Sequence, residues 1–441
     1  MRISRSHRAM RPNTTRRSRF ALFGVVTLLL SRPALVAGAG APPIDELTGA
    51  RQVCAAGPAA ARARAERLAG EAATAAAGVL PNPQLVIEHR RTLSGPSEQE
   101  TTVGIAVQLG LGGRRSLLQK VAEARSREAQ ADAHATLFES ALGFREAFVT
   151  AALDDARVAV LAEQQRAVEA LGVTIRGLAK GGESAGYSVV RQQTQASLHR
   201  RLLASMQARA AASKAMLEAW TGEEVTLASV ALPDLAGGAQ VSAPNPLPIM
   251  ASPPRVASQE AAAEASGLEA RAARRRWVPD VGVSAAYRSV TGVGAPMGHG
   301  IALGLSIPLT FFDHGQGQAA LADANRALAA ASAEGLKRES ASLTKAASAK
   351  LRMLEASVAD LDRAVAEAAS LQTMSVTLYT AGEATLTELL DAYGAAEQAR
   401  LARIELAEEI ARARLARMRA AGTLFQPALD QACGAAAEGA R

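Results

Sequence analysis

The 441-residue chain is 49% hydrophobic but only 3% aromatic, and much of its apolar content is alanine. This composition suits closely packed long helices better than a globular enzyme core filled with bulky rings. The formal net charge falls from +7 to −1 when residues 1–39 are removed, because that segment holds eight arginines and no acid, so we expect no basic face for nucleic acid on the mature chain.

Residues 1–39 have the three parts of an export signal. An arginine-rich stretch at 2–19 is followed by an apolar run at 20–30 and by small residues at 37–39, which predicts cleavage near Ala39. The alternative is an uncleaved membrane anchor, but the apolar run is shorter than the roughly 20 residues that span a bilayer. No later segment has 18 consecutive apolar residues.

The two cysteines, Cys54 and Cys433, lie near the two ends of the mature chain. In an exported protein an even count permits a disulfide between them. Two separate buried thiols fit the sequence equally well, because spacing alone does not show proximity.

The segment 40–222 reads as a first repeat: a helix, strands near 84–91 and 102–111, and long helices near 114–178 and 186–221. In the second strand every odd position from Val103 to Leu111 is apolar, whereas the even positions are small or polar. That period of two predicts a strand with one apolar face. The helices have apolar residues at coiled-coil spacing.

The proline-rich segment 223–254 predicts an irregular connector, and 255–422 reads as a second repeat. Its strands are expected near 281–290 and 300–311, its long helices near 316–379 and 386–421, and a tail follows at 423–441. The glycine turns and proline motifs of the two repeats recur at an offset near 200 residues. The chain therefore looks like a duplicated unit.

Strands of 9 to 11 residues with one apolar face are typical of a membrane barrel. A soluble sandwich also alternates, but does not usually isolate its hairpins between helices of this length. Four strands cannot close a barrel alone, because open edges in lipid leave backbone groups unpaired. The pattern thus predicts an α+β membrane protein that oligomerises.

Three motifs, LPNPQLVIE, LSIPLTFFDHGQGQAALADA and LYTAGEATLTELLDAYG, together resemble the TolC-like outer-membrane efflux proteins, nearest the CzcC/CusC heavy-metal type. The resemblance covers residues 50–425 and implies a homotrimer with a 12-stranded transmembrane barrel, four strands per protomer, continued by a coiled-coil helical barrel in the periplasm. It also implies a periplasmic adaptor protein and an inner-membrane pump of the RND type as partners, with outer-membrane lipid around the barrel.

The resemblance implies a periplasmic gate on the helix that begins inside the last motif, just past the turn at Gly382. Glu388 and Asp391 lie three residues apart and match two acids that ring the closed entrance, although acids at this spacing also occur on any solvated helix face. Tyr379 matches a position whose hydrogen bond helps hold the entrance shut, and simple packing is the alternative. Ala384 departs from relatives that have an arginine there.

The resemblance and the expected strands also indicate residues for adaptor docking and for the membrane interface. The turns between the long helices are the expected docking tips for the adaptor, namely Gly181, Gly182, Glu183, Gly382 and Glu383. Phe311 and Phe312, at the end of the last expected strand, are candidate aromatics at the membrane interface, with packing against the next helix as the alternative.

No metal, cofactor or catalytic site is expected. The mature histidines have no ligand spacing and imply no converging acid or cysteine partners; they are His89, His134, His199, His299 and His314. No nucleophile has a placed base, so we expect no enzyme. The function that the resemblance implies is a passive exit duct of a tripartite efflux system, which carries small molecules or metal ions out of the cell. Two alternatives remain open: the outer-membrane duct of a protein secretion system, and a periplasmic coiled-coil scaffold that enters no membrane.

Overall fold

The computed structural model describes residues 44–93, 98–110, 112–180, 186–222, 252–292, 295–424 and residue 433. The expected signal segment, most of the expected connector and most of the tail lie outside the described residues.

Most of the described chain is helical, and the elements follow the two-repeat order. The first repeat holds α1 (Glu46–Ala56), α2 (Pro58–Gly78), β1 (Gln84–Arg91), β2 (Glu98–Leu109), α3 (Arg114–Lys180) and α4 (Gly186–Thr221). The second holds α6 (Pro254–Arg274), η1 (Arg275–Trp277), β3 (Val281–Gly292), β4 (Ala295–Ser306), α7 (Gln316–Ala356), α8 (Val358–Thr380) and α9 (Leu386–Ala421). None of the described helices has an apolar stretch long enough to cross a membrane.

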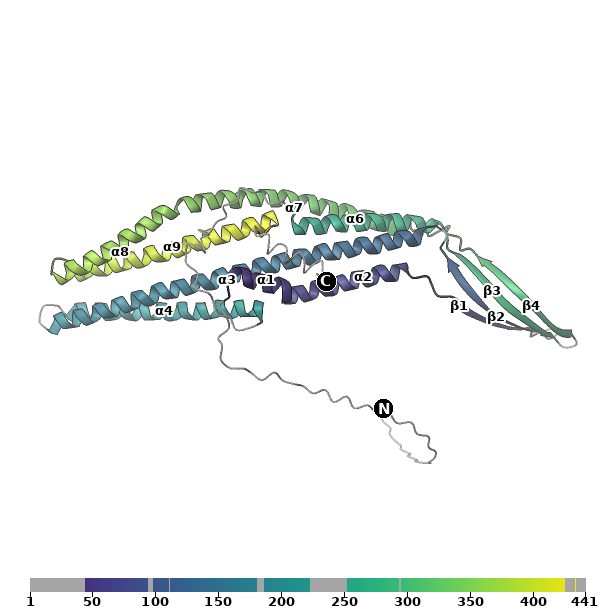
Figure 1. Ribbon diagram of the computed structural model, residues 1–441, viewed down its shortest axis with the longest axis horizontal. Coiled ribbons are helices and arrows are strands. Elements are labelled where there is room, and N and C mark those ends of the chain that lie inside the picture. The colour runs from purple at the N-terminus through teal and green to yellow at the C-terminus, as the bar shows by residue number, and fades with distance from the viewer. Residues whose placement is uncertain are drawn as a thin grey trace, which may run out of the picture. The chain divides into compact units, whose positions relative to one another are not determined.

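The four strands form one antiparallel sheet in the order β1-β2-β3-β4. β1 follows α2, α3 follows β2, β3 follows α6 and η1, and α7 follows β4, so all four helices meet the sheet at the same end (Figure 1). The same helices pack against one another in the order α2-α3-α6-α7. Each strand is therefore continued by one helix, and neighbours in the sheet remain neighbours among the helices.

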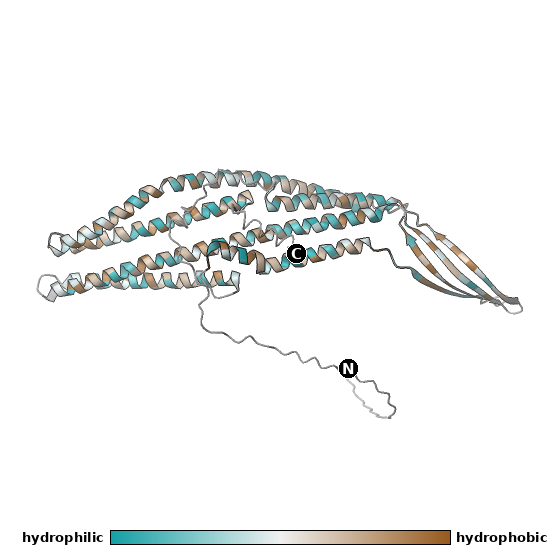
Figure 2. Ribbon diagram, viewed as in Figure 1, coloured by the Kyte–Doolittle hydropathy of each residue, from teal (hydrophilic) through white to brown (hydrophobic). Residues whose placement is uncertain are grey.

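The strand register places the apolar positions on one face of the sheet. Side chains of alternate residues point to the same face, so pairing of odd with odd positions aligns the apolar side chains in rows across the strands. One row contains Leu85, Ile105, Ala285 and Leu303, and the next contains Ile87, Val103, Tyr287 and Ile301. Figure 2 shows brown, hydrophobic segments that alternate with paler ones along the strands.

The last strand differs from the expected span of 300–311. β4 begins at Ala295 and ends at Ser306, so Phe311 and Phe312 lie beyond the strand rather than in it. Proline has no backbone N–H to donate to a ladder. Pro308 and Pro279 stand just past the last pair, Gly282 with Ser306, and so remove a donor from each strand where the pairing stops.

Two helical hairpins extend away from the sheet. α4 returns along α3, and α9 returns along α8 and α7, while α3 also packs against α9. The apolar stripe of the second hairpin is buried where Leu351, with Leu354 and Val358 beside it, packs on Ile410 and Ala413. The coiled-coil spacing in the sequence is thus used for packing between the two helices of a hairpin.

The expected single helix over 316–379 is broken at Ser357 into α7 and α8. The backbone N–H of Ser357 bonds to the carbonyl of Leu354 at 3.1 Å, and its hydroxyl donates to the same carbonyl at 2.8 Å. A serine hydroxyl that bonds to a nearby carbonyl competes with the regular helix ladder. The sequence pattern did not indicate this interruption.

The largest buried cluster joins both ends of the described chain to the middle of α3. It packs Val53 and Cys54 of α1 against Phe144 and Phe148 of α3, together with Met418 of α9. Gly49 lets α1 approach this closely, because a Cβ there would lie 2.1 Å from the Phe144 ring. The core is built from small residues and a few rings, as the alanine-rich composition predicts.

Candidate functional site: the helical tips and the outer face of the sheet

The second hairpin turns tightly between α8 and α9. Gly382 has a φ of +78°, a conformation that favours glycine, and its N–H bonds to the carbonyl of Tyr379 at 3.1 Å. Glu383 and Ala384 then donate their N–H groups to the carbonyl of Leu378 at 2.9 and 3.3 Å. These bonds satisfy carbonyls in the last turn of α8. Glu383 is exposed at the tip.

Glu388 closes a capping box at the start of α9. The Thr385 hydroxyl accepts from the Glu388 N–H at 3.3 Å, and the Glu388 carboxylate accepts from the Thr385 N–H at 2.6 Å and from its hydroxyl at 2.8 Å. These bonds, the backbone one first, lower the pKa of the Glu388 carboxyl below its usual value. Glu388 therefore stays ionised, with its carboxylate folded back onto its own helix terminus.

An apolar cluster beneath the tips joins the two hairpins. Leu171 and Ile175 of α3 pack against Leu386 and Leu389 of α9, and Tyr379 of α8 packs at the edge, partly buried. For Tyr379 the structure therefore shows the packing alternative within one protomer. The hydrogen bond across helices that the resemblance implies remains a prediction.

Asp391 lies in a groove between the two hairpins. The groove has a volume of about 290 Å³ and is lined by Asp391 and Leu390 of α9 and by Arg191 and Gln195 of α4, among others. Arg191 donates to the Thr387 hydroxyl at 2.7 Å, which ties α4 to the first turn of α9. Glu388 and Asp391 thus share an exposed helix face but differ in surroundings, since one caps the helix and the other faces the groove.

A histidine and a glutamate form a second tie between the hairpins, which the sequence analysis missed. His199 of α4 places Nδ1 3.5 Å from the carboxylate of Glu397 on α9, and both side chains are mostly buried. Burial raises the pKa of the Glu397 carboxyl, and the charge of His199 opposes that rise. The sequence implied no acidic partner for His199, because the two residues are almost 200 positions apart.

Farther from the tips, buried charges cross between α3, α4 and α9. Arg157 bonds to Asp154 at 3.0 Å and to Glu408, and Asp154 also accepts from Arg209 at 3.2 Å. Buried ion pairs of this kind are costly to break, because one charge is left without its partner. The bond from Arg157 to Glu408 joins α3 to α9 and so holds the first hairpin to the second, whereas the bonds to Asp154 lie within the first hairpin.

Gly181, Gly182 and Glu183 lie outside the described residues. Their assignment as docking residues stays a prediction, as does that of Gly382 and Glu383.

The apolar face of the sheet is open to its surroundings in the protomer. Ile301 and Leu303 of β4 each expose 82% of their surface, and Leu85 and Ile105 are also exposed. The opposite face carries small and polar residues, including an ion pair between Arg288 and Glu100 at 2.8 Å. Water strongly disfavours such a continuous apolar surface, so this face requires another environment.

Exposed aromatic residues gather where the sheet meets the helices. Phe311 exposes 76% and Phe312 93% of their surface, which excludes packing against the next helix within the protomer. Trp277, which the sequence analysis did not single out, lies beside them, because its carbonyl accepts from the Thr310 hydroxyl at 3.1 Å.

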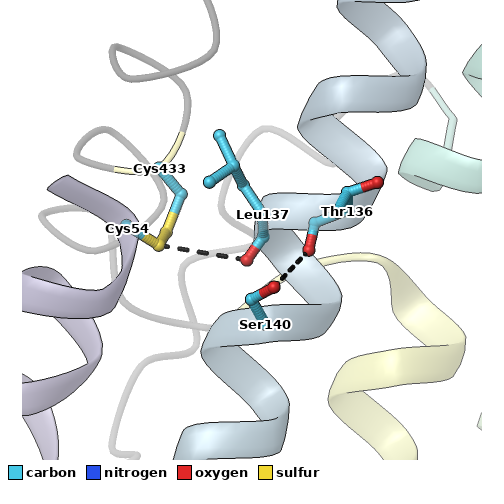
Figure 3. Close-up of a disulfide and its surroundings, with 5 residues drawn as sticks. All are labelled: Cys54, Thr136, Leu137, Ser140 and Cys433. Atoms are coloured by element: carbon cyan, nitrogen blue, oxygen red, sulfur yellow. Dashed lines mark hydrogen bonds between the residues drawn. A yellow bond between two sulfur atoms is a disulfide. The ribbon is translucent and has the colours of Figure 1, made fainter. Parts of the chain in front are cut away.

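Cys54 and Cys433 form a disulfide that ties α1 to the C-terminal tail. Both residues are buried, and Cys54 lies next to Leu137 of α3 (Figure 3). The disulfide spans 379 positions of sequence and sits in the largest apolar cluster.

Within the described residues no group of three or more histidine, cysteine, aspartate or glutamate side chains could hold a metal ion. The two strand histidines lie at opposite edges of the sheet, His89 on β1 and His299 on β4, in one cross-strand row with Thr101 and Ser289. They form the polar end of the otherwise apolar face.

No family model matches the chain. A curated relative, the nickel-cobalt-cadmium resistance protein NccC of Alcaligenes xylosoxydans xylosoxydans, is 28% identical over 319 residues, which are 70% of each chain. The solved structure of CusC, described in terms of transmembrane channel formation, has a TM-score of 0.71 at 16% identity and covers 88% of this chain and 96% of its own. The outer membrane protein VceC from Vibrio cholerae has a TM-score of 0.65 at 17% identity, over 86% of this chain and 96% of its own.

These comparisons confirm the resemblance that the sequence motifs predict. The structural neighbours are outer-membrane channels rather than enzymes, and at these identities they establish a shared fold.

Proposed function

We propose that this chain, whose fold is that of the TolC-like outer-membrane channels, is the exit duct of a tripartite efflux system. Three copies would each give four strands to one 12-stranded barrel in the outer membrane, and the helical hairpins would continue the duct into the periplasm. The duct is passive. An inner-membrane pump supplies the energy, through a periplasmic adaptor that docks on the tips.

The observation that supports this proposal most strongly is the four-stranded sheet with one apolar face and two free edges. β1 and β4 each pair on one side only among the described strands. Backbone groups at an open edge would be unpaired in lipid, where no water can replace the missing bonds. Sister copies that pair β4 with β1 would satisfy both edges and turn the apolar face toward lipid.

The height of the apolar face fits an outer membrane. It begins beside the polar row that contains His89 and His299, follows β4 to Ser306, and continues past the end of the strand to Phe311. If the residues past Ser306 continue as extended chain, the ten steps from Ile301 to Phe311 reach about 33 Å at the rise of a strand, and a tilt of about 40° reduces this to about 25 Å. An apolar band of about that height is typical of outer-membrane barrels.

The opposite face is suited to a water-filled lumen. Glu88 and Arg90 of β1 share it with Glu100 and Arg288, whereas Gly104, Ala286 and Ala302 supply small side chains. Charged side chains need water or a partner, so this face agrees with the water-filled lumen of a duct. The apolar face argues more strongly against a scaffold that enters no membrane.

At the other end of the duct, Glu388 and Asp391 of three copies would place six carboxylates around one axis. Acidic rings favour cations in pores. Tyr379 supports the same turn from α8, and Gly382 and Glu383 present the tip to the adaptor. In this proposal the entrance opens when the hairpins separate at the groove beside Asp391.

The cargo we propose is transition-metal cations. Support comes from the 28% identity to NccC, whose name describes nickel, cobalt and cadmium resistance. The absence of a metal cluster among the described residues does not oppose this, because a wide aqueous duct passes ions without binding them.

The test is to purify the full chain from membranes and measure its mass and its conductance in planar bilayers. We expect a trimer by native mass spectrometry, an apparent mass in gels that changes on heating, and currents carried by nickel, cobalt and cadmium chlorides. A stable monomer that stays dissolved in detergent-free buffer and gives no current would overturn the duct.

A further inference from the structure

Two segments lie side by side at the sheet-to-helix junction and place three exposed rings together. Thr310 bonds to the carbonyl of Trp277 at 3.1 Å, and Arg276 lies 3.4 Å from the Asp313 carboxylate. Trp277, 61% exposed, is therefore at the same level as Phe311 and Phe312. Tryptophan prefers the membrane-water interface, where its ring meets lipid and its N–H meets water.

The four arginines next to Trp277 divide into two pairs. Arg274 pairs with Asp323, and Arg276 pairs with Asp313, so these two charges are compensated. Among the described residues, no carboxylate lies within ion-pair distance of Arg271 or Arg275. Arg271 donates only to the carbonyl of Gly267, at 3.4 Å.

The two uncompensated arginines are placed to act together. Arg271 is in the last turn of α6 and Arg275 starts η1, four residues later, and both are exposed. Helical residues four apart lie on one face. A pair of free guanidinium groups thus stands beside the rings that end the apolar band.

Phosphate is the ligand that suits this arrangement. Guanidinium groups bind phosphate through paired N–H bonds. Two of them carry two positive charges, and because a zwitterionic headgroup has no net charge, the pair favours a headgroup with net negative charge. We propose that Arg271, Arg275 and Trp277 bind the headgroup of an anionic phospholipid in the periplasmic leaflet of the outer membrane. The proposal rests on the duct proposed above, which places the apolar face in that membrane.

The first test measures lipid retention by native mass spectrometry of the full-length trimer. We expect phosphatidylglycerol to bind more tightly than phosphatidylcholine, and the double variant Arg271→Gln/Arg275→Gln to bind phosphatidylglycerol at least about fivefold more weakly, since two phosphate contacts are lost. The matched control is Arg200→Gln/Arg201→Gln on α4, which removes the same charge from another exposed site. Equal binding by the two double variants would contradict the proposal.

The second test locates Trp277 in the bilayer. The variant Trp220→Phe leaves Trp277 as the single tryptophan, and vesicles of brominated phosphatidylglycerol should quench it most when the bromine is near the headgroup end of the acyl chain. The control Trp277→Phe leaves Trp220, which packs beside the helical core and should not be quenched. Absence of quenching of Trp277 would also contradict the proposal.

Conductance separates this inference from the duct itself. The Arg271→Gln/Arg275→Gln trimer is expected to conduct like the unmodified protein. If that trimer conducts but phosphatidylglycerol binding is unchanged, only the lipid site is wrong. If the unmodified chain forms no conducting trimer, the duct is wrong.

Discussion

The sheet and the helical hairpins sort their side chains in opposite ways. In the hairpins one stripe of apolar residues is buried between helices, as Ile175 and Leu389 are beneath the tips, although other leucines such as Leu328 are exposed in the protomer. In the sheet the apolar residues such as Leu303 face outward, and the charged residues share the other face. One chain is therefore adapted to two solvents, and the boundary between them lies near Trp277 and Phe311.

The two regions also gain stability differently. The helical part has buried apolar clusters, ion pairs such as Arg157 with Asp154, and the disulfide. The sheet has its ladder bonds and, in the proposed assembly, lipid and sister strands. A change in one region should leave the other largely intact, and the following predictions test this separation.

The largest effect is expected from removing the disulfide. Closing a loop of 379 residues restricts the unfolded chain, so Cys54→Ser/Cys433→Ser should lower the free energy of unfolding of the helical part by about 6 kcal/mol. Thermal unfolding followed by circular dichroism measures this loss. Reduced unmodified protein should behave like the variant, and insertion of the sheet at low temperature should not change.

A charge on the apolar face should damage the sheet instead. Leu305→Arg places a guanidinium in the middle of the band and should cost about 2 to 4 kcal/mol of stability in lipid. Urea unfolding in lipid vesicles measures the cost. Ser306→Arg, on the opposite face of the same strand, is the matched control, and an equal loss in both variants would mean that the faces are assigned wrongly.

The smallest effect is expected at the candidate gate. Glu388→Gln/Asp391→Asn removes six charges from the proposed trimer while glutamine can still complete the capping box. Single-channel recordings should show a higher conductance and a lower preference for cations, each changed by less than about tenfold because exposed charges interact weakly in water. Unchanged conductance and selectivity would count against a gating role.

The capping box at Glu388 should also make the stability of α9 depend on pH. Because hydrogen bonds from Thr385 lower the pKa of folded Glu388, the capping box stabilises α9 above the pKa of an unfolded glutamate. That contribution is lost as the pH falls through the lower folded pKa. The Glu388→Gln variant should lack this acid-dependent loss in a comparison of unfolding at several pH values.

The sequence by itself determined the face on which each strand residue lies and the duplicated order of elements. Both follow from local periodicity, since alternation in a strand and heptad spacing in a helix depend only on near neighbours. Boundaries were less well determined. The end of β4 at Ser306 depends on prolines just outside two paired strands, and the break at Ser357 depends on one hydroxyl bond.

Only the tertiary structure decided which distant residues meet. It placed His199 beside Glu397, Arg191 beside Thr387 and Cys54 beside Cys433, and it brought Trp277 level with Phe312 at the end of the apolar band. Each of these contacts joins segments whose separation exceeds any local period, so it is fixed by how the helices and strands pack. The local sequence pattern determined which face of each strand is apolar, and the packing of the elements determined which distant residues are in contact.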